Sequence, residues 1–298
     1  MTEREACGLI PVFKPEGWTS FDVIAKLRGI LHMKRLGHGG TLDPMATGVL
    51  PVFVGKAAKA CDILPDSDKT YEAGFKLGIT TDTQDITGKV LSENSRAVSS
   101  EDIERELAAF RGEIMQLPPM YSAVKVGGKR LYELAREGKE IERQPRKITV
   151  YEAELTGYGK DTREGNLRIS CSRGTYIRTI IHDLGNALGC GGAMTSLCRV
   201  RAAGFSLGEC FTLEQIAEKP LDEVLSPLMK AFESLPKTPP LSGHCTAMYK
   251  NGVKLRPEQI GAEGISGDFC VIDGDSTLLG IARTDTDKNE VRAVRNFY

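Results

Sequence analysis

The sequence has few of the residues and patterns that mark several large protein classes. Its 298 residues include one Trp and four His, and none of its eight Cys belongs to a C-x-x-C pair. Because no His or Cys shows zinc-ligand spacing, we predict no metal site. Scattered Cys in a chain of this length indicate reduced, mostly buried thiols.

Targeting, membrane and nucleotide signals are also missing. Residues 1–8 lack the basic-then-apolar pattern of a signal peptide, and no apolar run approaches the ~18 residues of a spanning helix. Residues 48–56 loosely resemble a phosphate loop, but six residues separate the glycines and Ala57 stands where Ser or Thr is needed. No G-x-G-x-x-G opens a helix. We therefore expect a cytoplasmic protein with no membrane association and no nucleotide cofactor.

The charge is balanced overall and uneven locally. A formal net charge of −1 argues against a nucleic-acid-binding protein. Residues 124–150, however, contain eight basic and four acidic side chains. Between residues 171 and 201, four Arg accompany a single acid, Asp183. Such segments are either solvated surfaces or a basic face that binds a phosphate backbone.

Local patterns predict an α+β fold with a mixed or antiparallel sheet and flanking helices. Thr19 with Asp22, and Ser99 with Asp102, have the spacing of helix capping boxes. The second helix is expected to bury Ile103, Leu107 and Phe110. A further helix is predicted from 176 to 188, ended by Gly189. Strand-like runs occur at 49–54, 71–77 and 167–171.

A Pro-rich segment, residues 236–240, separates two regions of different character. Beyond it, short strands broken by Gly are predicted at 269–272, 278–282 and 291–294. We therefore divide the chain into a large first domain, 1–235, and a small β-rich domain, 236–298.

Residues 37–51 are unusual in composition: four Gly and two Pro surround one His and one Asp. Glycines permit positive φ and close approach of a ligand, and Pro44 favours an extended Asp43. Apolar Leu42 and Met45 would keep the Asp43 carboxylate rigid and poorly hydrated. An ordinary Asp-Pro turn is the competing interpretation.

This segment resembles the catalytic motif of the bacterial TruB-type tRNA pseudouridine-55 synthases. Four further blocks resemble that family, in family order, over roughly residues 8–205. They are 69–73, 78–88, 118–125 together with 128–136, and 171–185. Gly39 stands where many members have Thr, Ala or Ser, which leaves His38 and Asp43 in register.

The resemblance implies roles for eight residues. Asp43 is the catalytic carboxylate, Arg178 keeps it ionised and oriented, and Tyr71 stacks on the flipped base and acts on the C5 proton. The other implied substrate-binding residues are His38, Lys69, Asp85, Tyr176 and Leu197. Pseudouridine formation is an isomerisation, so no metal or redox cofactor is chemically required.

The resemblance also implies the partners. A thumb-like insertion at about 122–150 would grip the T stem-loop of tRNA through phosphates. Guide-RNA-dependent relatives lack such a thumb, so we expect an enzyme that finds the tRNA T-loop without a protein partner. The resemblance also implies a monomer. The C-terminal domain is similar to the family's PUA-like RNA-binding domain only in position and β character.

Two other functions remain possible from the residues. A non-catalytic tRNA-binding or folding chaperone would use the same basic surfaces but would not need Asp43 or Arg178. A glycoside hydrolase would need a second catalytic carboxylate.

Overall fold

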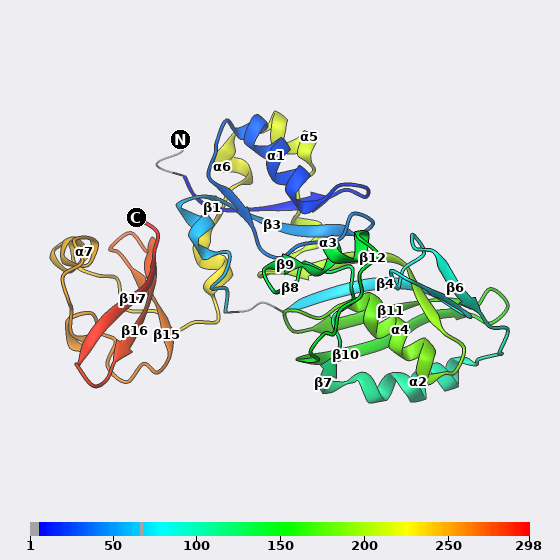
Figure 1. Ribbon diagram of the computed structural model, residues 1–298. Helices are drawn as coiled ribbons and strands as arrows, with labels where there is room; N and C mark the ends of the chain where they lie inside the picture. Colours follow the sequence, from blue (N-terminus) through cyan, green and yellow to red (C-terminus); the bar gives the residue numbers. More distant parts are fainter. Residues whose placement is uncertain (1–5, 66–67) are drawn as a thin grey trace. The chain divides into compact units, whose positions relative to one another are not determined.

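The computed structural model describes residues 6–65 and 68–298, which form two compact units (Figure 1). Among these residues, unit 1 holds 6–44, 48–65 and 202–298, and unit 2 holds 45–47 and 68–201. Both units combine helices with mainly antiparallel strands, which confirms the predicted α+β class. No helix within the described ranges has the length and apolar character needed to cross a membrane.

Unit 1 is built on two long antiparallel strands, β1 (Cys7–Lys14) and β3 (Thr47–Gly55). They pair from Cys7 with Gly55 to Lys14 with Gly48. Ile10, Val12 and Leu50 pack against α1 (Ser20–Leu31) and α5 (Leu213–Glu218). The short strands β2 (Leu36–His38) and β14 (Ser226–Pro227) lie beside β3 and β1. Unit 1 also contains η1 (Lys56–Ala60), β13 (Phe205–Ser206), η3 (Leu207–Glu209), α6 (Leu221–Val224) and η4 (Leu228–Phe232).

The opposite face of these strands contributes Leu9 and Phe53 to a second core that includes C-terminal residues Cys270 and Phe297. The C-terminal segment also has its own core and a three-stranded antiparallel sheet. The three C-terminal strands predicted from the sequence are therefore confirmed. The elements of this segment are α7 (Gly243–Lys250), η5 (Pro257–Gln259), β15 (Asp268–Ile272), β16 (Leu278–Asp285) and β17 (Glu290–Asn296).

Unit 2 contains a sheet in the strand order β12–β4–β11–β10–β7. The helices α2 (Ser100–Leu107) and α4 (Ile177–Ala187) pack against each other, and against strands β10 and β4 respectively. The five strands are β12 (Gly192–Ala202), β4 (Lys69–Leu77), β11 (Glu164–Cys171), β10 (Arg146–Gly159) and β7 (Gly112–Gln116). Shorter elements are β5 (Ile79–Thr81), β6 (Val90–Glu93), η2 (Ala108–Phe110), β8 (Lys125–Val126), β9 (Lys129–Arg130) and α3 (Leu131–Arg136).

The predicted helix starts are confirmed. Thr19 and Ser99 each accept from the amide three residues on, and the acidic residue there bonds back to the cap. The third helix begins after Tyr176, and Gly189, at φ 68°, follows its end.

Two expectations were wrong. Phe110 lies beyond α2 and is only partly buried, because the chain tightens there into a 3₁₀ turn.

The second wrong expectation concerns the cysteines. All eight are free, as predicted, but five are only partly buried; the fully buried thiols are Cys171, Cys190 and Cys270. Cys7, Cys61 and Cys210 pack against the second core of unit 1, and Cys245 packs against the core of the C-terminal segment.

Candidate active site

Asp43 lies in the loop between β2 and β3, and its two neighbours are anchored to the start of unit 1. Leu42, 3% exposed, donates its amide to Ser20 Oγ at 2.9 Å, and Ser20 Oγ donates to the Leu42 carbonyl at 3.3 Å. The Pro44 carbonyl accepts from the Gly17 amide at 2.8 Å. These hydrogen bonds therefore fix the backbone on both sides of Asp43.

Lys14, at the end of β1, is completely buried and adds a third anchor. Its Nζ donates to the carbonyl oxygens of Pro15 at 2.8 Å, Trp18 at 2.5 Å and Pro44 at 3.2 Å. A buried ammonium group is costly unless such acceptors replace its water. Lys14 thus ties β1 directly to the residue after Asp43.

His38 ends β2, where it pairs with Val52 of β3 and is partly buried. The next amide, that of Gly39, donates to the Pro51 carbonyl at 2.9 Å. A Cβ at Gly39 would lie 3.2 Å from the Phe53 ring, a close approach that suits glycine. His38 and Asp43 therefore belong to one anchored loop of unit 1.

Arg178 lies in the first turn of α4 and is 6% exposed, which excludes the surface arginine that an isolated Arg would suggest. Its Nη2 donates to the Tyr121 carbonyl at 2.8 Å, and its Nη1 lies 3.7 Å from Asp85 Oδ2. Its Cζ is 6.0 Å from the centroid of the Tyr176 ring. The guanidinium is thus held by three different segments of unit 2.

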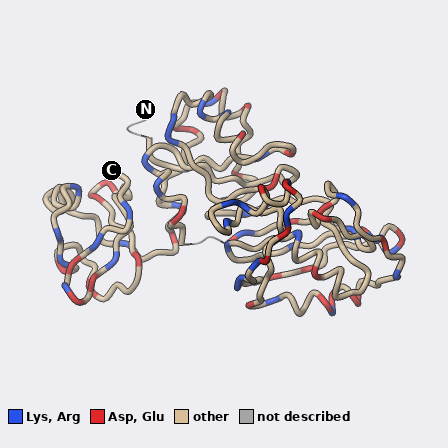
Figure 2. Tube along the Cα trace, viewed as in Figure 1, with Lys and Arg blue, Asp and Glu red and all other residues tan. Residues whose placement is uncertain are grey.

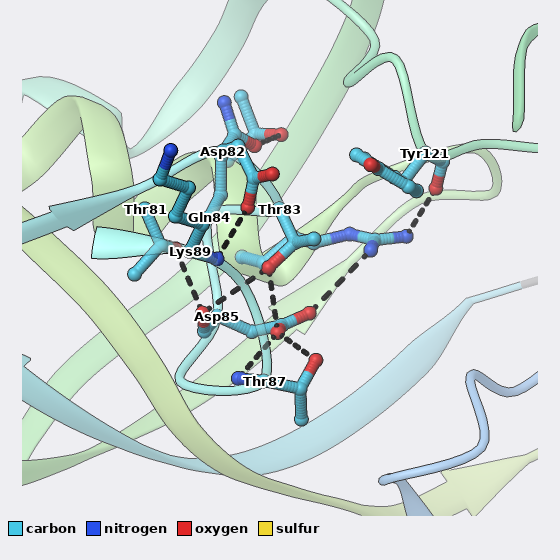
Figure 3. A network of polar contacts seen from close by, with 10 residues as sticks. Thr81, Asp82, Thr83, Gln84, Asp85, Thr87, Lys89 and Tyr121 are labelled. Atoms are coloured by element: carbon cyan, nitrogen blue, oxygen red, sulfur yellow. Dashed lines mark hydrogen bonds and ion pairs between the residues drawn. The ribbon is translucent and has the colours of Figure 1, made fainter. Parts of the chain in front are cut away.

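Asp85 is 4% exposed and sits in a turn rich in hydroxyl groups (Figure 3). Its Oδ1 accepts from Thr83 Oγ1 at 2.8 Å, Thr87 Oγ1 at 2.5 Å and Thr87 N at 3.0 Å. The neighbouring Gln84, at φ 67°, accepts from Thr179 of α4 at 2.7 Å. These bonds satisfy the carboxylate and fix the turn against α4.

The remaining sequence-predicted residues lie on strands and at the start of α4. Lys69 and Tyr71 are two residues apart on β4 and so project to the same face. Tyr71 and Leu197, of β12, are each 7% exposed. Burial, followed by the charge of Arg199, lowers the pKa of Lys69 to about 8.

Tyr176 caps α4 and is held through its backbone. Its amide donates to Gln116 Oε1 at 2.8 Å, and its carbonyl accepts from Gln116 Nε2 at 3.0 Å. Gln116 is 3% exposed, so these two hydrogen bonds lie in the interior of unit 2. It fixes the turn from which Arg178 projects.

Unit 2 thus brings Arg178, Asp85 and Tyr176 together, whereas Asp43 and His38 belong to unit 1. The implied pairing of Asp43 with Arg178 stays a prediction. Sequence reasoning missed the supporting groups because most act through backbone atoms or distant contacts; these are Lys14, Ser20, Thr83, Thr87, Gln116 and the Tyr121 carbonyl. Within the described residues, no group of three or more His, Cys, Asp or Glu is placed to hold a metal ion.

Comparison with known proteins identifies the family. Residues 28–177 match the N-terminal domain of TruB family pseudouridylate synthases, and residues 178–235 match the tRNA pseudouridylate synthase B C-terminal domain. The tRNA pseudouridine synthase B of Lachnoclostridium phytofermentans is 43% identical over 97% of this chain and 99% of its own length. That of Clostridium kluyveri is 42% identical over 84% of this chain and 86% of its own length.

Comparison with solved structures is consistent with this family. A chain in the crystal structure of a Cbf5-Nop10-Gar1 complex aligns with a TM-score of 0.77 and 27% identity, covering 98% of this chain and 85% of that chain. The sequence identity indicates the family, and the anchored Asp43 loop and the buried Arg178 are consistent with it. This chain belongs to the TruB family of pseudouridylate synthases.

Proposed function

We propose that this pseudouridine synthase isomerises the uridine at position 55 in the T-loop of tRNA, with Asp43 as its essential carboxylate. The substrate proposal is supported by the relatives, which are named tRNA pseudouridine synthase B. The role of Asp43 is supported chiefly by the anchoring of its loop, in which Lys14, Ser20 and Gly17 bind the neighbouring backbone groups.

The reaction breaks the bond from uracil N1 to ribose C1′, turns the base and joins C5 to C1′; C5 then loses its proton, and N1 gains one. Asp43 either attacks C1′ or removes a proton from C2′ to give a glycal. Both routes need an ionised carboxylate in a site that excludes water. Placement matters because small displacements of a reacting group cost large factors in rate.

Arg178 is proposed to keep Asp43 ionised and oriented. A nearby guanidinium lowers the pKa of a carboxyl group and binds it through directed hydrogen bonds. Arg178 is suited to this role because Asp85 and the Tyr121 carbonyl hold it in place.

The target base must leave its stack to reach these groups. We propose that Tyr71 stacks on the flipped base and takes part in the loss of the C5 proton, and that Leu197 packs against the base. The other proposed contacts to RNA are His38, Lys69 and Tyr176.

The enzyme is proposed to act as a cytoplasmic monomer on tRNA, without a guide RNA or protein partner. Residues 1–235 would form the catalytic domain, with a thumb-like segment at about 122–150. Residues 236–298 would form a PUA-like RNA-binding domain. The thumb-like segment carries Lys125, Lys129 and Arg130 on exposed short strands, which suits contact with phosphates.

Carbodiimide modification followed by primer extension tests the substrate. An unmodified tRNA transcript incubated with the enzyme should give one new stop, next to position 55. A transcript with cytidine at that position should give none. Tight binding of the transcript with no new stop would instead favour the RNA-chaperone function.

A further inference from the structure

The chain that follows β7, residues 117–122, makes hydrogen bonds in two directions, and we call it the β7 loop. The Tyr121 carbonyl accepts from Arg178 Nη2 of α4 at 2.8 Å. The next carbonyl, that of Ser122, accepts from the Tyr132 amide of α3 at 3.1 Å. Ser122 is 3% exposed, so this part of the loop lies in the interior of unit 2. Two adjacent carbonyls of the loop thus bind the guanidinium and the helix of the thumb-like segment.

Arg143, in the second half of the thumb-like segment, contacts the same loop. Its Nη1 donates to the Pro118 carbonyl at 3.1 Å, and its Nη2 pairs with Glu140 Oε1 at 3.0 Å. The Arg143 side chain is 17% exposed, whereas that of Glu140 is 78% exposed. Pro118 is itself buried. Arg143 therefore reaches from the thumb-like segment to a backbone group three residues before Tyr121.

The contact to Pro118 is unusual for a cation of the thumb-like segment. Acidic and basic residues are interspersed along most of the chain (Figure 2), so a surface ion pair such as that with Glu140 is ordinary. Arg143 also donates to a carbonyl that is 25 residues away in sequence. A guanidinium presents several donors in one plane and can bind two acceptors at once. Arg143 thus joins two distant segments of unit 2.

The start of α4 is bound to both ends of this stretch of chain. Gln116, the last residue of β7, binds the amide and the carbonyl of Tyr176, which caps α4, at 2.8 and 3.0 Å. Tyr121 binds Arg178 in the first turn. Pro118 lies between these two contacts. A displacement at Pro118 would therefore move the Tyr121 carbonyl, and small displacements near the reacting groups cost large factors in rate.

We propose that Arg143 is a positioning residue, which holds the β7 loop where the Tyr121 carbonyl orients Arg178. This inference rests on the proposed function, because it takes Arg178 as the group that orients Asp43. It gives the thumb-like segment a role in the chemistry besides contact with phosphates. Loss of the Arg143 contact should therefore slow the reaction of bound RNA more than it weakens RNA binding.

The test compares Arg143→Gln and Arg143→Lys with Glu140→Gln, a matched control that removes only the exposed partner of Arg143. Tritium release from C5-labelled tRNA is measured in single turnovers at saturating enzyme, and the dissociation constant in separate titrations. Arg143→Gln should release tritium about tenfold to hundredfold more slowly, with a dissociation constant close to that of wild type. Arg143→Lys, which keeps the charge and a donor, should recover most of the rate, and Glu140→Gln should match wild type.

Amide hydrogen exchange gives a second readout, which does not need activity. The Ser122 amide donates to the Met120 carbonyl, and the Tyr132 amide donates to Ser122. In Arg143→Gln both amides should exchange about threefold to tenfold faster, because the loop that supports them loses a hydrogen bond. Exchange in Glu140→Gln should equal that of wild type. Arg143 lies outside the helices and strands, so its variants should fold, and thermal unfolding checks this.

Weaker tRNA binding by Arg143→Gln with a wild-type release rate at saturation would overturn the proposal, since Arg143 would then act only in binding. Wild-type exchange of the Ser122 and Tyr132 amides would also overturn it. So would an equal loss of rate in Glu140→Gln, or an Arg143→Lys variant as slow as Arg143→Gln. If the wild type binds tRNA but releases no tritium, the proposed function fails, and the exchange result still decides whether Arg143 holds the β7 loop.

Discussion

Arg178 and Asp85 form an ion pair in the interior of unit 2, with 3.7 Å between Nη1 and Oδ2 and each side chain 6% exposed. Burying two charges is costly unless their remaining hydrogen-bonding groups are satisfied. Thr83 and Thr87 satisfy the carboxylate, and the Tyr121 carbonyl accepts from the guanidinium. Arg178 is therefore held in place by unit 2 itself.

Replacing Asp85 with Ala should lower the free energy of unfolding by about 3–5 kcal/mol, because the buried ion pair between Asp85 and Arg178 is lost. Urea denaturation measures the change. Glu72→Ala is the control, since it breaks a surface pair with Arg168 in which the side chains are 57% and 46% exposed; it should cost less than about 1 kcal/mol. Equal losses of unfolding free energy in the two variants would show that the buried Asp85–Arg178 pair contributes no more to stability than a surface pair.

Lys14→Met should reduce stability by about 2–3 kcal/mol, since the carbonyls of Pro15, Trp18 and Pro44 lose a buried donor. Because Pro44 follows Asp43, kcat for pseudouridine formation should fall more than KM rises. Thermal unfolding and steady-state kinetics measure the two effects. Lys26→Met, at an exposed position of α1, should change neither; a Lys14 variant with normal kcat would remove the proposed positioning role.

Affinity for tRNA should decline above pH 8 in a way that depends on Lys69. In the free protein its pKa is lowered to about 8, chiefly by burial and then by Arg199. A bound phosphate favours the charged amine and raises that pKa. Affinity is therefore full below about pH 8 and is lost as pH rises from there toward the raised pKa of the complex.

Binding measured at about pH 7, 8 and 9 tests this prediction, with Lys69→Gln as the control for titration of the RNA bases. The thiol of Cys171, with a pKa of about 11, titrates outside the window. Identical pH profiles for wild type and Lys69→Gln would contradict the prediction.

Local patterns in the sequence predicted the helix starts because capping is local. Thr19 and Ser99 each need only a partner three residues away. The same holds for the helix that carries Arg178, whose end is followed by Gly189 in a left-handed conformation. Contacts between distant segments were not predictable in this way. The Tyr121 carbonyl that binds Arg178 is 57 residues away in sequence and carries no side-chain signal.

The buried state of Lys14 could not be predicted for a related reason. Lysines are almost always exposed, and the three carbonyls that justify this exception come together only when β1 meets the Asp43 loop. Motif resemblance identified Asp43 and Arg178 as candidates, but not the groups that hold them. Those groups are what the structure adds.

Phe297→Ala should destabilise the protein by about 3–5 kcal/mol. Phe297 is 3% exposed and its ring centroid lies 6.1 Å from that of Phe232, in a core shared with Phe53. Val294→Ala, at a nearby position that is 39% exposed, should cost less than about 1 kcal/mol. Differential scanning calorimetry compares them. A Phe297 variant as stable as the Val294 variant would mean that the C-terminal residues add little to this core.

Tritium release from tRNA labelled at uracil C5 tests the central claim most directly, because joining C5 to C1′ must expel that atom. Wild type, Asp43→Asn and the control Asp161→Asn, at an exposed turn, are compared at RNA concentrations that saturate binding. We predict release by wild type and Asp161→Asn and none by Asp43→Asn, with all three binding tRNA alike. Release by Asp43→Asn at the wild-type rate would show that Asp43 is not the catalytic carboxylate.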